Sequence, residues 1–145
     1  MPETTSKPKP ESGEVETAAE FHAALRLFLR TVERMARDHG LTPQRYFLML
    51  MIYAAPGRQS TVSELGERLQ LAQSTATELV ARAERVGLID RSDSPDDARR
   101  SMLTLSAEGE ARLLRVFAAL TGERRHLAEA FSHASALQAA FEAHA

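Results

Sequence analysis

The sequence of 145 residues contains no cysteine. This absence excludes disulfide bonds, thiol-based redox sensing and metal or iron–sulfur sites built from cysteine ligands. No run of about 18 apolar residues is present, so we expect no membrane-spanning helix. Residues 1–13 lack the apolar core of a secretory signal, and their composition predicts a disordered tail. These absences together predict a soluble, cytoplasmic protein.

Lysine is nearly absent as well: Lys7 and Lys9 are the only lysines, and every other cation is arginine. Arginine suits bidentate contacts with phosphate or guanine, although a genome-wide composition bias gives the same pattern. The formal net charge is -2, which is not that of a simple nucleic-acid clamp. Any DNA binding must therefore come from local placement of arginines.

Enzyme signatures are missing too. The sequence has no nucleophile elbow, phosphate-binding loop or metal-ligand motif, and Ser74 has no nearby histidine to activate it. His126 and His133 are seven residues apart and share a face only if one helix is continuous there. We therefore expect no enzyme, no cofactor and no metal site.

What is present is a succession of helical patterns. Apolar residues at helical spacing predict helices over residues 14–39 and 43–55. The second of these is apolar on all sides, which is typical of a helix buried at the centre of a molecule. Later patterns predict helices over residues 107–130 and 132–143.

Between them lies a helix-turn-helix pattern. Thr61-Val62-Ser63-Glu64 is a capping box that begins a helix ending near Leu69, and a second helix covers residues 73–86. Short strands follow at residues 88–91 and 102–105, joined by a charged loop at residues 92–101. The predicted fold class is mainly α: a winged helix-turn-helix with a two-stranded wing, flanked by N- and C-terminal dimerisation helices.

The second helix of a helix-turn-helix places its N-terminal residues against base edges in the major groove. Glutamine can read adenine, serine and threonine can contact bases or phosphates, and glutamate can accept from cytosine but repels phosphates. A solvated helix face is the alternative for a lone helix, but the wing that follows favours DNA reading. The candidate residues on this helix are Gln73, Ser74, Thr75, Thr77, Glu78, Arg82 and Arg85.

The wing loop carries both acids and arginines at its tip. We expect Asp97 to pair with a nearby arginine and to hold the loop in shape. Arg99 or Arg100 is then placed to enter a minor groove, where narrow A·T tracts attract arginine. An ordinary charged loop is the alternative.

The chain resembles the MarR family of winged-helix transcription regulators over about residues 40–110. The resemblance implies a homodimer that binds a pseudo-palindromic double-stranded DNA operator, usually as a repressor released by a ligand or an oxidant. The matching motifs are Leu41-Thr42-Pro43, Thr61-Val62-Ser63-Glu64-Leu65, Gln73-Ser74-Thr75 continuing to Leu79-Val80, Glu84-Arg85-Val86-Gly87-Leu88-Ile89-Asp90-Arg91, Asp97-Ala98-Arg99-Arg100 and Leu103-Thr104-Leu105-Ser106-Ala107-Glu108-Gly109.

The chain departs from the family pattern at two places. Ala72 stands where a serine cap is common, which removes roughly 1 kcal/mol of helix capping. Glu78 stands where a basic residue is frequent. From Arg58 to Leu105 there are seven arginines and eight acids, so the local balance is -1. These departures leave a second class open, a winged-helix protein-interaction module with weak or no DNA binding.

We expect a single domain over residues 14–145, with a winged core at 58–105 and dimerisation helices at 14–40 and 106–145. The outer helices carry more apolar surface than one small lobe needs, which favours pairing around a two-fold axis over a monomeric bundle. In many relatives an effector binds between the dimer helices and the winged core. Candidate lining residues for a small aromatic or anionic effector are His22, Arg26, Arg30, Tyr46, Met49 and Tyr53; core packing is their alternative role.

Overall fold

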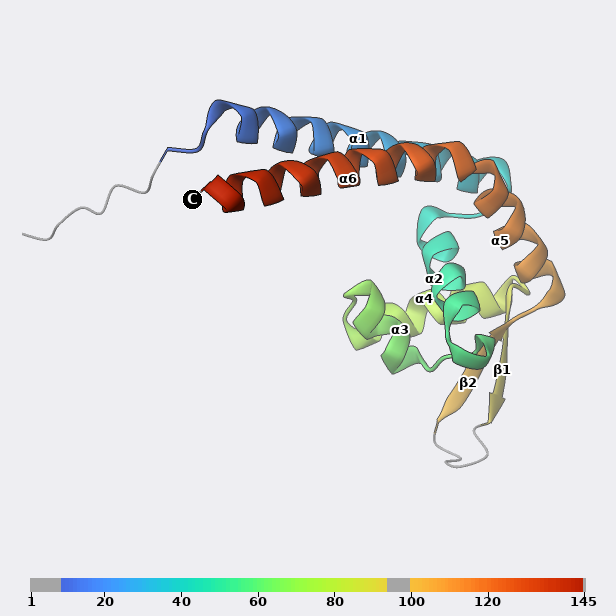
Figure 1. The fold of residues 1–145 in the computed structure, drawn as a ribbon. Coiled ribbons are helices and arrows are strands. Elements are labelled where there is room, and N and C mark those ends of the chain that lie inside the picture. The colour runs from blue at the N-terminus through green and yellow to red at the C-terminus, as the bar shows by residue number, and fades with distance from the viewer. Residues whose placement is uncertain (1–8, 94–99, 145) are drawn as a thin grey trace, which may run out of the picture. The chain divides into compact units, whose positions relative to one another are not determined.

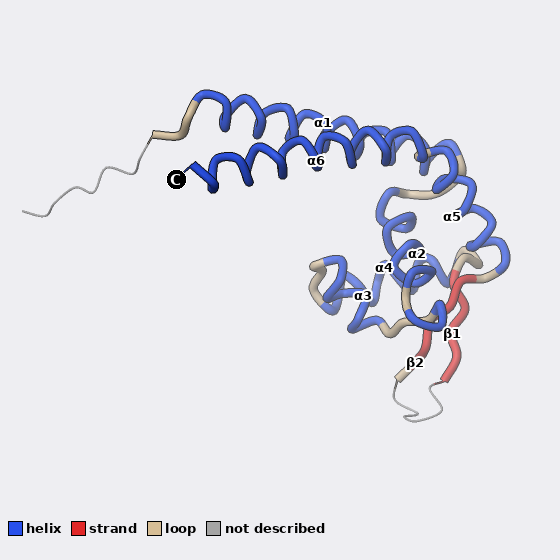
Figure 2. Tube along the Cα trace, viewed as in Figure 1, coloured by secondary structure: helices blue, strands red, loops and turns tan. Residues whose placement is uncertain are grey.

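The computed structural model describes residues 9–93 and 100–144. Figures 1 and 2 show the helices and the two strands in these ranges. Their bounds are α1 (Ser12–Asp38), α2 (Pro43–Ala54), the 3-10 helix η1 (Pro56–Arg58), α3 (Val62–Leu69), α4 (Gln73–Arg85), β1 (Ile89–Asp93), β2 (Ser101–Leu105), α5 (Ala107–Ala119) and α6 (Thr121–His144).

The chain divides into two compact units. We call Val32–Leu120 the winged unit, and Met1–Thr31 together with Thr121–Ala145 the helical unit. The winged unit encloses an apolar core to which α2, α3, α4 and both strands contribute. The buried members of this core are Leu48, Ile52, Leu65, Val80, Ala83, Ile89 and Leu103.

Helix α2 lies at the centre of the winged unit, as its all-round apolar sequence predicts. It contacts α3, α4, α5 and β2. Its start is fixed by Thr42, whose hydroxyl oxygen accepts a hydrogen bond from the Arg45 amide at 3.2 Å. Pro43 occupies the first turn, where its missing N–H leaves no unsatisfied donor.

Local hydrogen bonds cap α3 at both ends. Thr61 accepts from the Glu64 amide at 3.2 Å, and the Glu64 carboxylate accepts from the Ser60 hydroxyl at 3.0 Å. Helix α3 ends at Gln70 in a left-handed conformation, with φ of 57°. The Leu71 amide then donates to the Gly66 carbonyl at 2.8 Å. The Leu71 bond closes the turn that leads from α3 into α4.

The wing is an antiparallel hairpin of β1 and β2, with Ile89 opposite Leu105 and Asp93 opposite Ser101. Ser60 adds an isolated bridge to Leu103: its N–H donates to the Leu103 carbonyl at 3.1 Å, and the Leu103 N–H donates back at 2.8 Å. The strands are longer than the predicted residues 88–91 and 102–105. The bridge joins the base of the wing to the start of α3.

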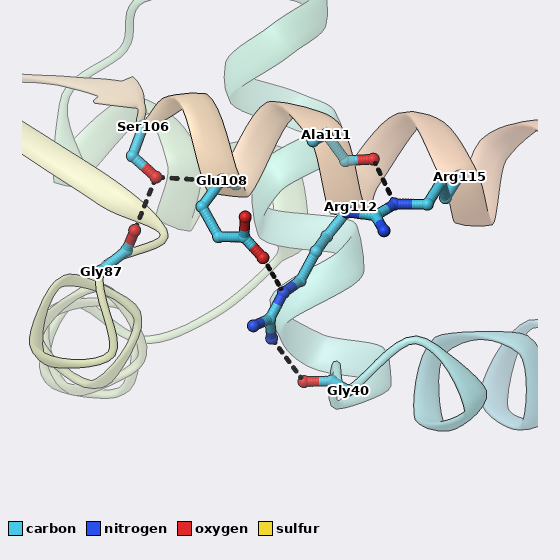
Figure 3. A network of polar contacts seen from close by, with 8 residues as sticks. Gly40, Gly87, Ser106, Glu108, Ala111, Arg112 and Arg115 are labelled. Atoms are coloured by element: carbon cyan, nitrogen blue, oxygen red, sulfur yellow. Dashed lines mark hydrogen bonds and ion pairs between the residues drawn. The ribbon is translucent and has the colours of Figure 1, made fainter.

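A polar network joins the residues just after α1 and α4 to the start of α5 (Figure 3). Ser106 caps α5 by accepting from the Gly109 amide at 3.0 Å, and its hydroxyl donates to the Gly87 carbonyl at 2.6 Å. Arg112 donates to Glu108 at 2.7 Å and to the Gly40 carbonyl at 3.4 Å. The end of α4 and the end of α1 are thereby both tied to the first turns of α5.

The predicted break between the last two helices was wrong. We expected it near residue 131, but α5 ends at Ala119 and α6 runs from Thr121 to His144. Leu120 is fully buried, and its amide bonds to the carbonyls of Val116 and Phe117. Packing of Leu120 thus sets the break, whereas Ser132, expected to begin the last helix, lies inside α6.

In the helical unit, α1 and α6 lie side by side (Figure 1). The rings of Phe21 and Phe131 meet edge to face with centroids 5.7 Å apart. Several large apolar side chains of this unit nevertheless remain exposed: Leu27 at 59%, Phe131 at 60%, Val15 at 53% and Leu29 at 46%. None of the helices in the described part of the chain is long and apolar enough to cross a membrane.

The architecture confirms the predicted fold class: a mainly helical winged helix-turn-helix with a two-stranded wing. The residues assigned to separate subdomains, and the pairing role of the outer helices, stay predictions.

Candidate nucleic-acid interface

Helix α4 presents one buried and one exposed face. Ala76, Val80 and Ala83 are buried against the core of the winged unit. All seven side chains of α4 that the sequence marks for DNA contact are exposed: Gln73, Ser74, Thr75, Thr77, Glu78, Arg82 and Arg85. This separation leaves one polar helix face available for a partner.

The close approach of α3 to α4 depends on Gly66. A Cβ atom built on this glycine would lie 3.3 Å from the Leu71 carbonyl oxygen and 3.4 Å from the Ala76 Cβ. Ala72 begins α4 in an extended conformation and supplies no side-chain cap, as its side chain predicts. The first amides of α4 therefore face outward without a side-chain cap at that position.

A cavity of about 260 Å³ lies where α3, α4 and the wing meet. Two guanidinium groups, from β1 and from the residue just before β2, line it together with hydroxyl and amide groups. Across it the Ser63 hydroxyl and the Gln73 side-chain oxygen lie 3.5 Å apart. The lining residues are Thr61, Val62, Ser63, Gln73, Thr77, Arg91, Arg100 and Ser101.

Two ion pairs cross this surface. Arg82 contacts Glu78 one turn earlier on α4, with Nη2 to Oε1 at 2.5 Å. Arg91 on β1 donates through Nε and Nη2, both at 3.2 Å, to one carboxylate oxygen of Glu84. The second pair links the wing to α4 and holds the Arg91 side chain beside the cavity.

Sequence reasoning missed five residues that line this cavity: Thr61, Val62, Ser63, Arg91 and Ser101. Arg91 had a readable signal, since it comes two residues after the buried Ile89 and so points to the same face of the strand. Arg100 was predicted and lines the cavity. Asp97 and Arg99 lie outside the described residues.

The residues predicted for an effector divide between the two units. His22, Arg26 and Arg30 are exposed on α1 in the helical unit, and His22 lines a cavity of about 240 Å³ with Phe21 and Gln138. In the winged unit Tyr46 and Met49 are buried in the core. The Tyr53 ring lies under the Arg58 guanidinium, 4.2 Å from its centroid. Within the described ranges, no three carboxylate or imidazole side chains gather as a metal site would.

Comparison with known proteins identifies this surface. Residues 39–100 match the model of the MarR family. Over these residues the chain is similar to the MarR family. The matched segment contains α2, α3, α4 and β1, and so most of the cavity and the whole exposed face of α4.

Relatives agree with this assignment. The transcriptional regulator HosA of Escherichia coli is 34% identical, over 62% of this chain and 66% of its own length. AbsC, a MarR-family regulator of Streptomyces coelicolor, superposes with a TM-score of 0.70 at 19% identity, over 85% of this chain and 84% of AbsC. Sco3205 from the same organism, solved in complex with DNA, gives a TM-score of 0.69 at 22% identity, over 97% and 92% of the two chains.

The chain spans between 53% and 66% of the length of the first four curated relatives it matches. The structural likenesses extend over the helical unit as well, since they cover 85% and 97% of this chain. The family match thus lies within the winged unit, whereas the likeness to solved structures covers residues of both units.

Proposed function

We propose that this chain is a sequence-specific DNA-binding transcription regulator, and that it acts as a homodimeric repressor. The observation that carries the proposal is the junction of α3, α4 and the wing. There an exposed polar helix face adjoins a cavity with two guanidinium groups, from Arg91 and Arg100. This arrangement suits a DNA duplex. The arginines of the cavity can contact phosphates, which fix the register, and the exposed helix face can contact base edges, which give specificity.

In this proposal the residues have separate tasks. Gln73, Ser74, Thr75, Thr77 and Glu78 read base edges from the start of α4 in the major groove. Arg82 and Arg85 follow along the helix toward the phosphates. Arg91 and Arg100 hold a backbone phosphate in the cavity with the hydroxyls of Ser63 and Ser101. For Arg99, with Asp97 as its partner, the proposed task is contact with the minor groove.

The dimer is supported by the exposed apolar side chains of the helical unit, above all Leu27 and Phe131. Two copies related by a two-fold axis present two α4 helices to a duplex, and this symmetry requires a pseudo-palindromic operator. Sco3205, whose fold this chain shares, was solved in complex with DNA, which supports DNA as the partner of this chain too.

The test is binding to a fluorescent duplex of the promoter region beside the chain's own coding sequence, measured by anisotropy at several salt concentrations. We expect binding that weakens steeply as salt rises, because phosphate contacts release counterions. Arg91→Ala and Arg100→Ala should each weaken binding about tenfold and reduce the salt slope by about one. Arg34→Ala, an exposed arginine of α1, is the matched control and should bind normally.

Binding that ignores salt and all of these arginines would overturn the proposal. It would favour the alternative, a winged-helix protein-interaction module. Glu78 and the local charge balance of -1 are the observations on the side of that alternative.

A small aromatic or anionic effector remains part of the proposal. Support comes from His22, which lines a cavity in the helical unit, and from the exposed cations Arg26 and Arg30 on the same helix. Tyr46 and Met49 are buried in the core. The residues left for binding an anion are therefore those on α1. Benzoate is a suitable probe: it should raise the melting temperature of the chain and not that of Arg26→Ala. No shift with benzoate would count against the effector.

A further inference from the structure

We infer that Glu78 is a specificity-determining residue that selects cytosine at the centre of the face that α4 presents to DNA. The inference rests on the proposed function, since it needs α4 to lie in the major groove. Repulsion by the phosphates alone would disfavour a carboxylate at this position. The inference instead gives Glu78 a direct role in base recognition.

The first observation is the position of Glu78 on the helix. With about 3.6 residues per turn, Glu78 lies opposite the buried stripe of Ala76, Val80 and Ala83. Its side chain is 62% exposed. A residue opposite the buried face of a recognition helix meets the floor of the groove before it meets the phosphates at the sides. Glu78 is therefore placed to contact bases.

The second observation is the ion pair with Arg82, which joins Oε1 of Glu78 to Nη2 at 2.5 Å. The guanidinium lies one turn further along the same face and offsets the charge of the carboxylate locally. This offset reduces the repulsion that an acid meets between two phosphate strands. It also holds the carboxylate along the helix axis while leaving most of the side chain open to solvent.

The chemistry of the carboxylate then decides the base. An ionised carboxylate only accepts hydrogen bonds. In the major groove guanine presents two acceptors and thymine one, so neither can be its partner. Adenine presents a donor next to the N7 acceptor, whereas cytosine presents the N4 amino donor. Cytosine is the base that an acceptor-only side chain tolerates best.

Replacement by glutamine gives a sharp test, because an amide carries both a donor and an acceptor. Glutamine pairs bidentately with N6 and N7 of adenine. Glu78→Gln should therefore move the preference at one position of each half-site from cytosine to adenine. A purely structural role for Glu78 would not change one base preference into another.

The experiment is repeated selection of bound duplexes from a pool of randomised double-stranded DNA, using the full chain. Three proteins are compared: the wild type, Glu78→Gln, and Glu33→Gln. Glu33 is the matched control, because it forms an ion pair with Arg37 at the same spacing, 2.7 Å long, on α1. Circular dichroism and thermal unfolding confirm that all three are folded.

We expect the wild-type and Glu33→Gln pools to converge on the same DNA site. The pool selected by Glu78→Gln should contain adenine in place of one cytosine of each half-site. Binding is then measured to two duplexes that differ only in this base, cytosine or adenine. The wild type should bind the cytosine duplex about tenfold more tightly, and Glu78→Gln should bind the adenine duplex about tenfold more tightly. A wild-type pool that converges, with no cytosine dependent on residue 78, overturns this inference and leaves the proposed function standing. A wild-type pool that converges on nothing overturns both.

Discussion

The two units of the molecule differ in how far they bury their apolar side chains. Among the residues whose burial is described, every buried apolar side chain belongs to the winged unit. In the helical unit, Leu27, Phe131 and Val15 stay more than half exposed. An exposed apolar patch, if these side chains form one, is typical of an interaction site. The difference teaches that the winged unit is stabilised from within, while the helical unit leaves apolar side chains in solvent, as the proposed dimer predicts.

The largest expected effect is the loss of a core side chain from the winged unit. Leu48 is fully buried in α2, so Leu48→Ala should lower the free energy of unfolding by about 3 kcal/mol through lost transfer energy and a residual cavity. Chemical denaturation checks this value. Leu114→Ala, at a leucine of α5 that is 39% exposed, is the control and should cost clearly less. Equal losses of unfolding free energy in the two variants would contradict the difference between buried and exposed apolar side chains.

A second prediction concerns the base of the wing. A Cβ atom built on Gly109 would lie 2.1 Å from the Leu88 carbonyl oxygen, so one of the two backbones must shift. Gly109→Ala should therefore destabilise the protein by about 2 kcal/mol. The matched control is Gly122→Ala in α6, where an added Cβ meets nothing within 4 Å. Alanine there should be neutral or stabilising, by up to about 1 kcal/mol.

The helical unit should respond through association instead of folding. Leu27→Asp places a charge among the exposed apolar side chains, and it should weaken self-association more than tenfold, or by about 2 kcal/mol. Sedimentation equilibrium measures the constant. Val86→Asp, at an exposed valine of the winged unit, should leave self-association unchanged. If both substitutions act alike, the helical unit is not the pairing surface.

The smallest effect is expected at the start of α4. Ala72 begins this helix without a side-chain cap. Ala72→Ser supplies a hydroxyl for the first amides and should stabilise the winged unit by about 1 kcal/mol. A rise in melting temperature without a change in self-association is the expected result. A destabilised protein would mean that the new hydroxyl does not reach the helix amides.

These elements also show how far local sequence signals reach. The caps at Thr42 and Thr61 and the spacing of apolar residues in α4 predicted the helix starts and the exposed face of α4, because capping and periodicity are local. The break at Leu120 and the bridge from Ser60 to Leu103 could not be predicted, since both depend on packing between distant segments. For Arg91, the position two residues after the buried Ile89 indicated the face of the strand, but not the contact with Glu84 or the place in the cavity. The exposed face of α4 could thus be predicted from the sequence, whereas the cavity beside it could not.

The most direct test of the account is the mass of the protein–DNA complex. Light scattering of the chain with a duplex obtained by selection should give two chains per duplex, because in the proposed dimer the helical unit pairs two copies and each winged unit reads one half-site. Leu27→Asp should reduce the amount of this complex. A stable complex with one chain per duplex, or one unaffected by Leu27→Asp, would contradict the division of work between the two units.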